Sequence, residues 1–215
     1  MTLQAYLSFL VAALVVIATP GPDSMNSLAI GLARGRREGV AYALGVGVGC
    51  LLHTLWAALG VSALVAASAT AFAVIKWIGV AYLVVLGVQA LRGNAPLALP
   101  AAGAMPRPVA ASQRFRQGLL TNALNPKVML FFLAFLPQFV DPSGGAASIP
   151  LQMVLMGGSF ALVTALAYCA LASGAGSIGA RLLTRPGVAH ALERGTGLVF
   201  LTLAARLALA ERDRP

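Results

Sequence analysis

The sequence predicts an all-α integral membrane protein with six transmembrane helices, arranged as two inverted three-helix repeats with interrupted helices 1 and 4. Three observations support this prediction: the composition, the length of the apolar runs, and a pair of breaks within them. Of the 215 residues, 59% are hydrophobic and 10% are charged, whereas a soluble domain carries about 25% charged residues. Several apolar runs reach the roughly 20 residues with which a helix crosses a bilayer.

Six apolar runs follow one another along the chain. The first covers about residues 3–33 and is broken between Pro20 and Pro22, and the fourth covers about residues 117–140 and is broken at Asn125 and Pro126. The other four cover about residues 39–65, 72–91, 150–173 and 188–209. Helices are expected because open sheet edges cannot face lipid, and the runs lack the alternation of a membrane barrel.

A polar, proline-rich stretch divides the chain into two halves. We expect a first three-helix repeat over residues 1–91, a cytoplasmic linker over 92–116 and a second three-helix repeat over 117–215. An odd number of spans in each half forces the halves into opposite orientations. Each half also opens with an interrupted helix, and such paired interruptions are typical of the binding site of a transporter.

The net charge of +9 comes mainly from arginines between the apolar runs. Basic residues collect in cytoplasmic loops, so their distribution predicts a multi-pass protein of the cell (inner) membrane with both termini periplasmic. A nucleic-acid partner is not expected, because a soluble basic domain would not be this apolar. The basic residues assigned to the cytoplasmic side are Arg34, Arg36, Arg37, Arg92, Arg107, Arg114, Arg116, Arg181, Arg185 and Arg194. The basic tail, with Arg206, Arg212 and Arg214, departs from the rule.

The first break, Thr-Pro-Gly-Pro-Asp, places Asp23 within a membrane span. Pro20 and Pro22 lack the N–H of a helical residue, so carbonyl groups upstream of them are left free to face a cavity. Gly21 lies between the two prolines. A carboxylate at this depth is costly and normally faces a cavity or a partner. Asp23 is expected to cap the second half-helix, to bind a substrate amine or a coupling proton, or to do both.

The second break brings further polar residues to the same depth. Asn122 and Asn125 are three residues apart and share a helix face, and Pro126 removes another backbone donor. Lys127 follows Arg116 by eleven residues, which places it roughly 16 Å deeper in the membrane. The two breaks therefore offer an acid and a base that either pair with each other or bind a zwitterion.

Other residues indicate less specific roles. His53 lies in the second run and is a candidate for a proton relay with Asp23, although a histidine in an apolar span is more often a packing residue. Cys50 and Cys169 both lie inside apolar runs and are expected to be free thiols. No metalloprotease, hydrolase or P-loop motif is present in the sequence, so we expect no enzyme activity, no cofactor and no metal site.

Two stretches resemble the signatures of the LysE/RhtB family of amino-acid exporters. These are ATPGPDSMNSLAIGLARGRREGVAYALGVGVG in the first half and FRQGLLTNALNPKVMLFFLAFLPQFV in the second. The resemblance covers nearly the whole chain and implies efflux of amino acids or their derivatives from the bacterial cytoplasm, with proton coupling. The matching positions are Pro20, Gly21, Pro22 and Asp23 in the first signature and Asn125, Pro126 and Lys127 in the second.

The function expected from these observations is secondary active efflux of a small zwitterionic solute. Homoserine, threonine, lysine and their lactones all remain candidates, and an ion exporter or a passive channel of the same architecture is the alternative. The expected substrate-binding residues are Asp23, Asn122, Asn125 and Lys127, with cavity backbone at Pro20, Gly21, Pro22 and Pro126. The expected partners are the solute and the lipid bilayer, and a homodimer is left open.

Overall fold

The computed structural model describes residues 1–61, 69–92, 108–141, 143, 148–175 and 186–209, and each element within these ranges is helical. The predicted linker residues 93–107, with Arg107, and also Arg181, Arg185, Arg212 and Arg214, lie outside these ranges. The α-helices are α1 (Leu3–Ala18), α2 (Pro22–Arg34), α3 (Arg36–Trp56), α5 (Ala69–Leu91), α6 (Ala111–Ala123), α7 (Pro126–Leu130), α8 (Ser148–Ser173) and α10 (Pro186–Leu209). Two π-helical segments, η1 (Ala57–Val61) and η2 (Phe131–Phe135), and the 3-10 helix η3 (Leu136–Phe139) complete the elements.

The two predicted breaks are sharp bends between consecutive helices. The axes of α1 and α2 differ by 52°, and those of α6 and the helical stretch Pro126–Phe139 differ by 49°. In each case a proline occupies the first turn of the second helix, where its missing N–H costs nothing. The sequence therefore predicts both interruptions at the residues where they occur.

Two of the described helices are long and apolar enough to cross a membrane. The number rises to as many as four if each bent pair of helices counts as one span. The two continuous ones are Arg36–Gly60 and Ser148–Ser173, and Lys76–Leu91 is a shorter apolar helix. These findings agree with an all-α membrane protein, while the six-span repeat architecture stays a prediction. The fourth apolar run starts earlier than expected, because α6 begins at Ala111 and includes residues assigned to the linker.

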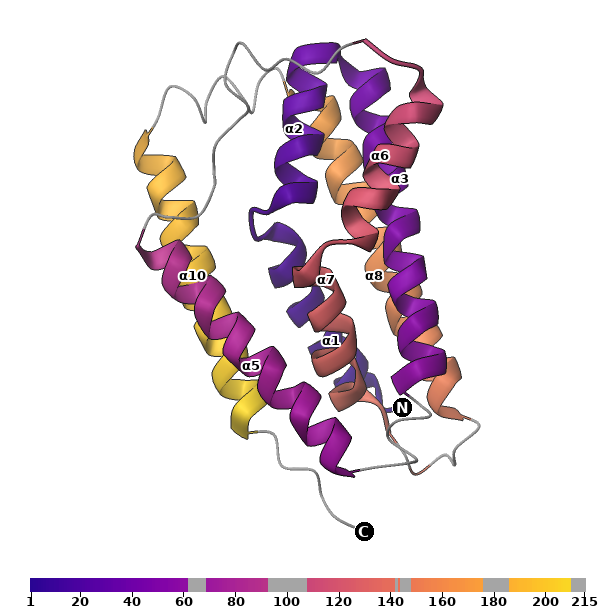
Figure 1. Ribbon diagram of the computed structural model, residues 1–215, viewed down its shortest axis with the longest axis vertical. Helices are drawn as coiled ribbons and strands as arrows, with labels where there is room; N and C mark the ends of the chain where they lie inside the picture. Colours follow the sequence, from indigo (N-terminus) through magenta and orange to yellow (C-terminus); the bar gives the residue numbers. More distant parts are fainter. Residues whose placement is uncertain (62–68, 93–107, 142, 144–147, 176–185, 210–215) are drawn as a thin grey trace.

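Helix α3 lies at the centre of the larger group of helices, packed against α6, α8 and α2 (Figure 1). Helices α5 and α10 run side by side as a separate pair, and α5 contacts the rest of the molecule at η2. The site described below lies among α1, α2, α6 and α7. The α5–α10 pair covers its other side.

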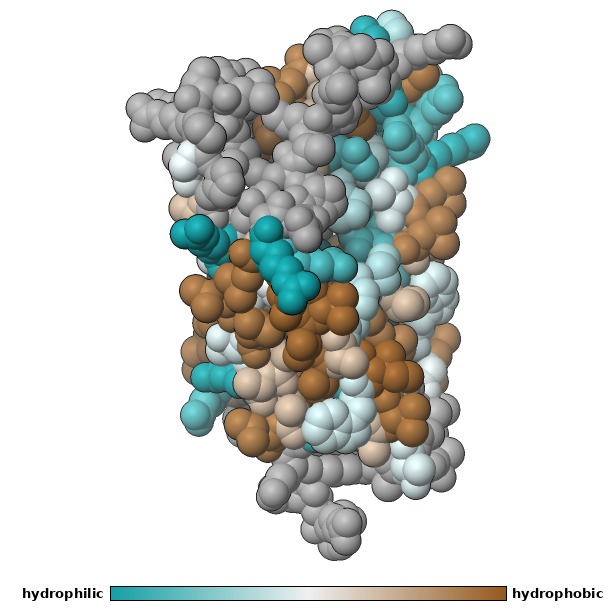
Figure 2. Space-filling view, turned by 60° about the vertical axis from the view of Figure 1, so that its left-hand side comes forward, coloured by the Kyte–Doolittle hydropathy of each residue, from teal (hydrophilic) through white to brown (hydrophobic). Residues whose placement is uncertain are grey.

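The outer surface of the helices is strongly apolar. Large side chains such as Leu7, Val11, Leu55, Leu155 and Leu162 are at least half exposed, as expected where lipid replaces water. Figure 2 shows hydrophobic residues across the middle and lower part of one face, with hydrophilic residues gathered mainly above them. The N-terminus and the end of α10 at Leu209 lie toward one end of the molecule, and the connection between α2 and α3, flanked by Arg34 and Arg36, lies at the other (Figure 1).

Candidate functional site

The break between α1 and α2 exposes main-chain carbonyl groups to side chains from other helices. Pro20 has no N–H to donate to Val16, and the Gly21 N–H turns to the Ser24 hydroxyl at 3.0 Å. The carbonyl oxygens of the preceding turn consequently accept hydrogen bonds from elsewhere. Tyr168 of α8 donates its hydroxyl to the carbonyl of Ile17 at 3.1 Å.

Lys127 of α7 reaches across to this break. Its Nζ donates to the carbonyl oxygen of Val16 at 3.2 Å and to that of Thr19 at 3.0 Å. The side chain is 8% exposed, so its charge is held largely by backbone dipoles inside the protein. Gly21 makes this approach possible, because a Cβ atom on that residue would lie 3.0 Å from Nζ.

The break between α6 and α7 is organised by Asn125. Its side-chain oxygen accepts the N–H of Lys127 at 3.0 Å and so caps α7, while Pro126 occupies the first position of that helix. The amide nitrogen of the same side chain donates to Asp23 at 2.8 Å. One residue thus ties together the two breaks and both charged groups.

Asp23, in the first turn of α2, is the centre of a buried polar cluster. Its Oδ2 accepts hydrogen bonds from the amide groups of Asn122, at 2.7 Å, and Asn125, at 2.8 Å. All three residues are 3% exposed or less. Within the described part of the chain, Oδ1 of Asp23 and Oδ1 of Asn122 have no hydrogen-bond partner. Two buried acceptors therefore lack a donor, which is unusual in a folded protein.

The acid and the base at the two breaks bind different groups. The ion pairs found among the described residues are those of the N-terminus with Asp141 and of Glu38 with Arg114. Asp23 is held by two asparagine amides and Lys127 by two carbonyl groups. The sequence left open whether Asp23 and Lys127 pair with each other or bind a zwitterion. The structure describes both residues and does not show a direct ion pair between them.

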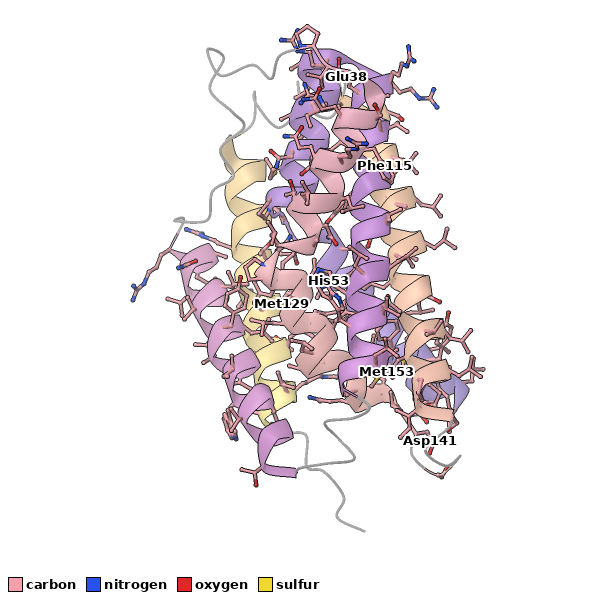
Figure 3. The ribbon with its side chains drawn as sticks, turned by 45° about the vertical axis from the view of Figure 1, so that its right-hand side comes forward. Glu38, His53, Phe115, Met129, Asp141 and Met153 are labelled. Atoms are coloured by element: carbon pink, nitrogen blue, oxygen red, sulfur yellow. The ribbon has the colours of Figure 1, made fainter. Side chains whose placement is uncertain are left out.

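His53 of α3 joins the cluster through Asn122. Its Nε2 lies 2.9 Å from the main-chain oxygen of Asn122, and its ring packs edge-on against Trp56 with centroids 5.3 Å apart. The side chain is almost fully buried. Figure 3 shows His53 about halfway along the long axis, with Glu38 near one end and Asp141 near the other. The cluster therefore lies deep within the helices.

One residue that sequence reasoning did not assign to the site, Gly49, packs against it, and one further buried polar group, Thr164, has no hydrogen-bond partner among the described residues. A Cβ atom on Gly49 would lie 2.7 Å from Oδ1 of Asn122, so this glycine admits the asparagine side chain. Thr164 of α8 is buried, and its hydroxyl lacks a hydrogen-bond partner among the described residues. Gly49 follows Gly45 by four residues, a spacing typical of close helix packing in membranes, whereas nothing in the sequence around Thr164 distinguishes it from other polar residues in spans.

The described residues do not form a metal site. They contain no group of three or more His, Cys, Asp or Glu side chains that could hold a metal ion. Cys50 is buried in α3 and Cys169 is partly buried in α8, and both are free thiols. The arrangement instead offers hydrogen-bond acceptors and one ammonium group, which suit a small solute carrying both charges.

Comparison with known proteins gives a consistent family. The family described as LysE type translocator matches residues 14–211. The chain is 36% identical over 205 residues to an uncharacterized membrane protein of Pseudomonas aeruginosa, covering 94% of each chain. It is 32% identical over 207 residues to a leucine efflux protein of Klebsiella pneumoniae, covering 94% of each. It is 27% identical over 219 residues to a homoserine/homoserine lactone efflux protein of Salmonella typhimurium, covering 98% of each. No solved structure matches the chain.

Proposed function

This chain belongs to the LysE type translocator family, and we propose from that membership that it exports amino acids or their close derivatives from the cytoplasm. Relatives that match over nearly the whole chain are named as efflux proteins for leucine and for homoserine or its lactone. The names differ in substrate, so homoserine, threonine, lysine and lactones stay within the proposed range. Neither the family nor these names describes an enzyme.

The observation that carries the proposal is the buried cluster at the two helix breaks. A substrate ammonium group would donate to Oδ1 of Asp23 and to Oδ1 of Asn122, the two acceptors that lack donors. A substrate carboxylate would accept from Lys127, since an ammonium group has three N–H donors and two are engaged with carbonyl groups. An amino acid carries both of these groups at a fixed separation.

We propose a six-span architecture of two inverted repeats for transport. The first repeat consists of α1–α2, α3 and α5, and the second of α6–α7, α8 and α10. Two observed contacts join equivalent helices of the two halves, α3 with α8 and α5 with α10, as is expected of helices that lie beside a two-fold axis in the membrane plane. Substrate would then bind near the midplane, where α2 and α7 begin.

Proton coupling through Asp23 is part of the same proposal. Protonation of Asp23 would convert Oδ1 into a donor and so weaken its affinity for an ammonium group, which links proton binding to substrate release. His53 is the proposed second member of the relay, connected through Asn122. In proteoliposomes, a pH gradient should accelerate amino-acid transport. Equal rates with and without the gradient would contradict coupling.

The proposed function is tested by profiling the amino acids in the medium of cells with and without the expressed protein. Efflux should fall about tenfold or more in Asp23→Asn and in Lys127→Gln, because a hydrogen bond to a charged group contributes about 1.5–3 kcal/mol. Glutamine at position 127 keeps an N–H donor for the carbonyl groups while removing the charge.

Matched controls are available elsewhere in the chain. Asp141→Asn and Lys76→Gln remove an acid and an amine that the structure places away from the cluster, and both should export at the wild-type rate. Wild-type rates in Asp23→Asn and Lys127→Gln at normal expression would disprove the site. Amino-acid profiles that do not differ between expressing and non-expressing cells would disprove the function.

A passive channel or an ion exporter of the same architecture is the alternative. Asp23 is a single carboxylate, whereas divalent cations bind several oxygen ligands, so the cluster favours a solute. A carrier should saturate and should exchange labelled against unlabelled solute across vesicles. Transport that neither saturates nor shows such exchange would favour the channel. Whether the carrier works as a homodimer is tested by measuring its mass in detergent or nanodiscs.

A further inference from the structure

A small cavity lies beside Lys127, between the broken helices and the α5–α10 pair. Its volume is about 10 Å³, which is room for about one water molecule. Lys127 contributes one wall, Gly79 and Leu83 of α5 a second, and Leu203 of α10 a third. The cavity is therefore next to the group to which we assign the substrate carboxylate.

The walls of this cavity are apolar apart from Lys127. Among the described residues that line it, Lys127 alone is charged, and the others are glycine, alanine or large apolar residues. A positively charged group placed here would be repelled by the ammonium group and would find no acid among these neighbours. An aliphatic group would be in contact with side chains of its own kind.

A larger open groove of about 610 Å³ adjoins the cavity. The groove runs between α1, η3 and α10, and it shares two lining residues with the cavity, Phe135 and Leu203. These two side chains therefore lie between the closed space at Lys127 and the open groove. A shift of the α5–α10 pair, which contacts the rest of the molecule mainly at η2, would enlarge the cavity at this boundary.

We propose that this cavity is the side-chain pocket of the substrate site and that the exported amino acids are neutral with aliphatic side chains. The inference rests on the proposed function and narrows it. With the carboxylate at Lys127 and the ammonium group at Asp23, the side chain extends toward Gly79 and Leu83. At about 10 Å³ the cavity is closed in this structure, so α5 must move to admit a side chain, and the size of residue 83 sets the largest side chain that enters.

The test measures uptake of labelled leucine, alanine and lysine into proteoliposomes loaded with an unlabelled mixture of amino acids. Wild-type protein should carry leucine and alanine but lysine at least about tenfold more slowly. Leu83→Trp should lower the leucine rate about tenfold relative to the alanine rate, since a pocket discriminates by about 10- to 200-fold per methylene group. The control is Val84→Trp, the next residue of α5, whose side chain is 39% exposed and outside the pocket.

A second variant guards against a Leu83→Trp protein that fails to fold. Leu83→Ala enlarges the pocket, so transport of phenylalanine should rise relative to leucine. A leucine-to-alanine ratio unchanged in both variants, or lysine carried as fast as leucine, would overturn the pocket. Wild-type protein that carries lysine alone would overturn the pocket and leave the proposed function standing. Wild-type protein that carries no amino acid would overturn both.

Discussion

Gly21 sets the position of the Lys127 ammonium group, which leads to the first prediction. An added Cβ atom would lie 3.0 Å from Nζ and 3.5 Å from Cε of Lys127. The backbone at Gly21 is extended, with φ −169°, so alanine is not strained there and acts only through this contact. We expect Gly21→Ala to fold normally and to lower export about tenfold or more, because small misplacements of a binding group are costly.

The measurement for Gly21→Ala is the efflux rate normalised to the amount of protein in the membrane. Gly60→Ala is the matched control, since a Cβ atom there would meet nothing within 4 Å. The control should export normally. Export by Gly21→Ala at the control rate would show that the position of Lys127 does not matter for transport.

At the scale of single residues, the sequence predicts which residues form the polar cluster but not which hydrogen bonds they make. A proline, an acid or a lysine within an apolar run is conspicuous, because each is costly in lipid. Which group pairs with which depends on where helices far apart in sequence cross. The carbonyl groups of Val16 and Thr19 therefore emerge as the partners of Lys127 only in three dimensions, as does the contact of Asn122 with Gly49.

At the scale of elements, the crossing of α3 and α6 depends on two glycines. A Cβ atom on Gly118 would collide with the carbonyl oxygen of Tyr42, and one on Gly45 with the carbonyl oxygen of Phe115. Such close backbone approach is typical of helices packed in a membrane. It fixes α6, and with it Asn122, against α3. The crossing therefore supports the site as well as the fold.

We expect Gly118→Ala to destabilise the protein by about 1–3 kcal/mol, because overpacking forces the two backbones apart. Stability is measured by the fraction of detergent-solubilised protein that stays monodisperse after heating. Gly158→Ala in α8 is the control, since a Cβ atom there meets open space. Its stability should be equal to or slightly above that of the wild type. Equal melting of both variants would contradict the role of the crossing.

The sequence predicts where the helices are interrupted better than it predicts whether a segment is α-helical or π-helical. Proline and glycine mark both interruptions, so these were predictable. The π-helical segments η1 and η2 continue the same apolar pattern as the helices before them. A π-helical turn differs from an α-helical turn in its hydrogen bonding rather than in its composition. The residue pattern of these segments therefore does not predict it. The first residues of α6 belong to the polar, proline-rich stretch from which the sequence predicts a linker, yet they are helical, and Arg114 among them is buried against Glu38 at 2.8 Å.

At the scale of the whole molecule, the charge distribution predicts how the protein lies in the membrane. Arg34, Arg36 and Arg37 lie at the connection between α2 and α3, at the end of the molecule opposite the N-terminus and the last described turn of α10 (Figure 1). Glu38 and its partner Arg114 lie near that same end (Figure 3). Clusters of arginine stay on the cytoplasmic side. We therefore expect this end to face the cytoplasm and both termini to face the periplasm.

This orientation is measured with single cysteines and a maleimide that does not cross membranes. Cys50 and Cys169 are first replaced by alanine. Gln4→Cys, near the N-terminus, should then be labelled in intact spheroplasts, whereas Arg37→Cys should be labelled only after lysis, because both side chains are exposed at opposite ends. Labelling of both after lysis is the control for reactivity. The reverse pattern would place the N-terminus in the cytoplasm and would contradict the orientation expected from the arginines.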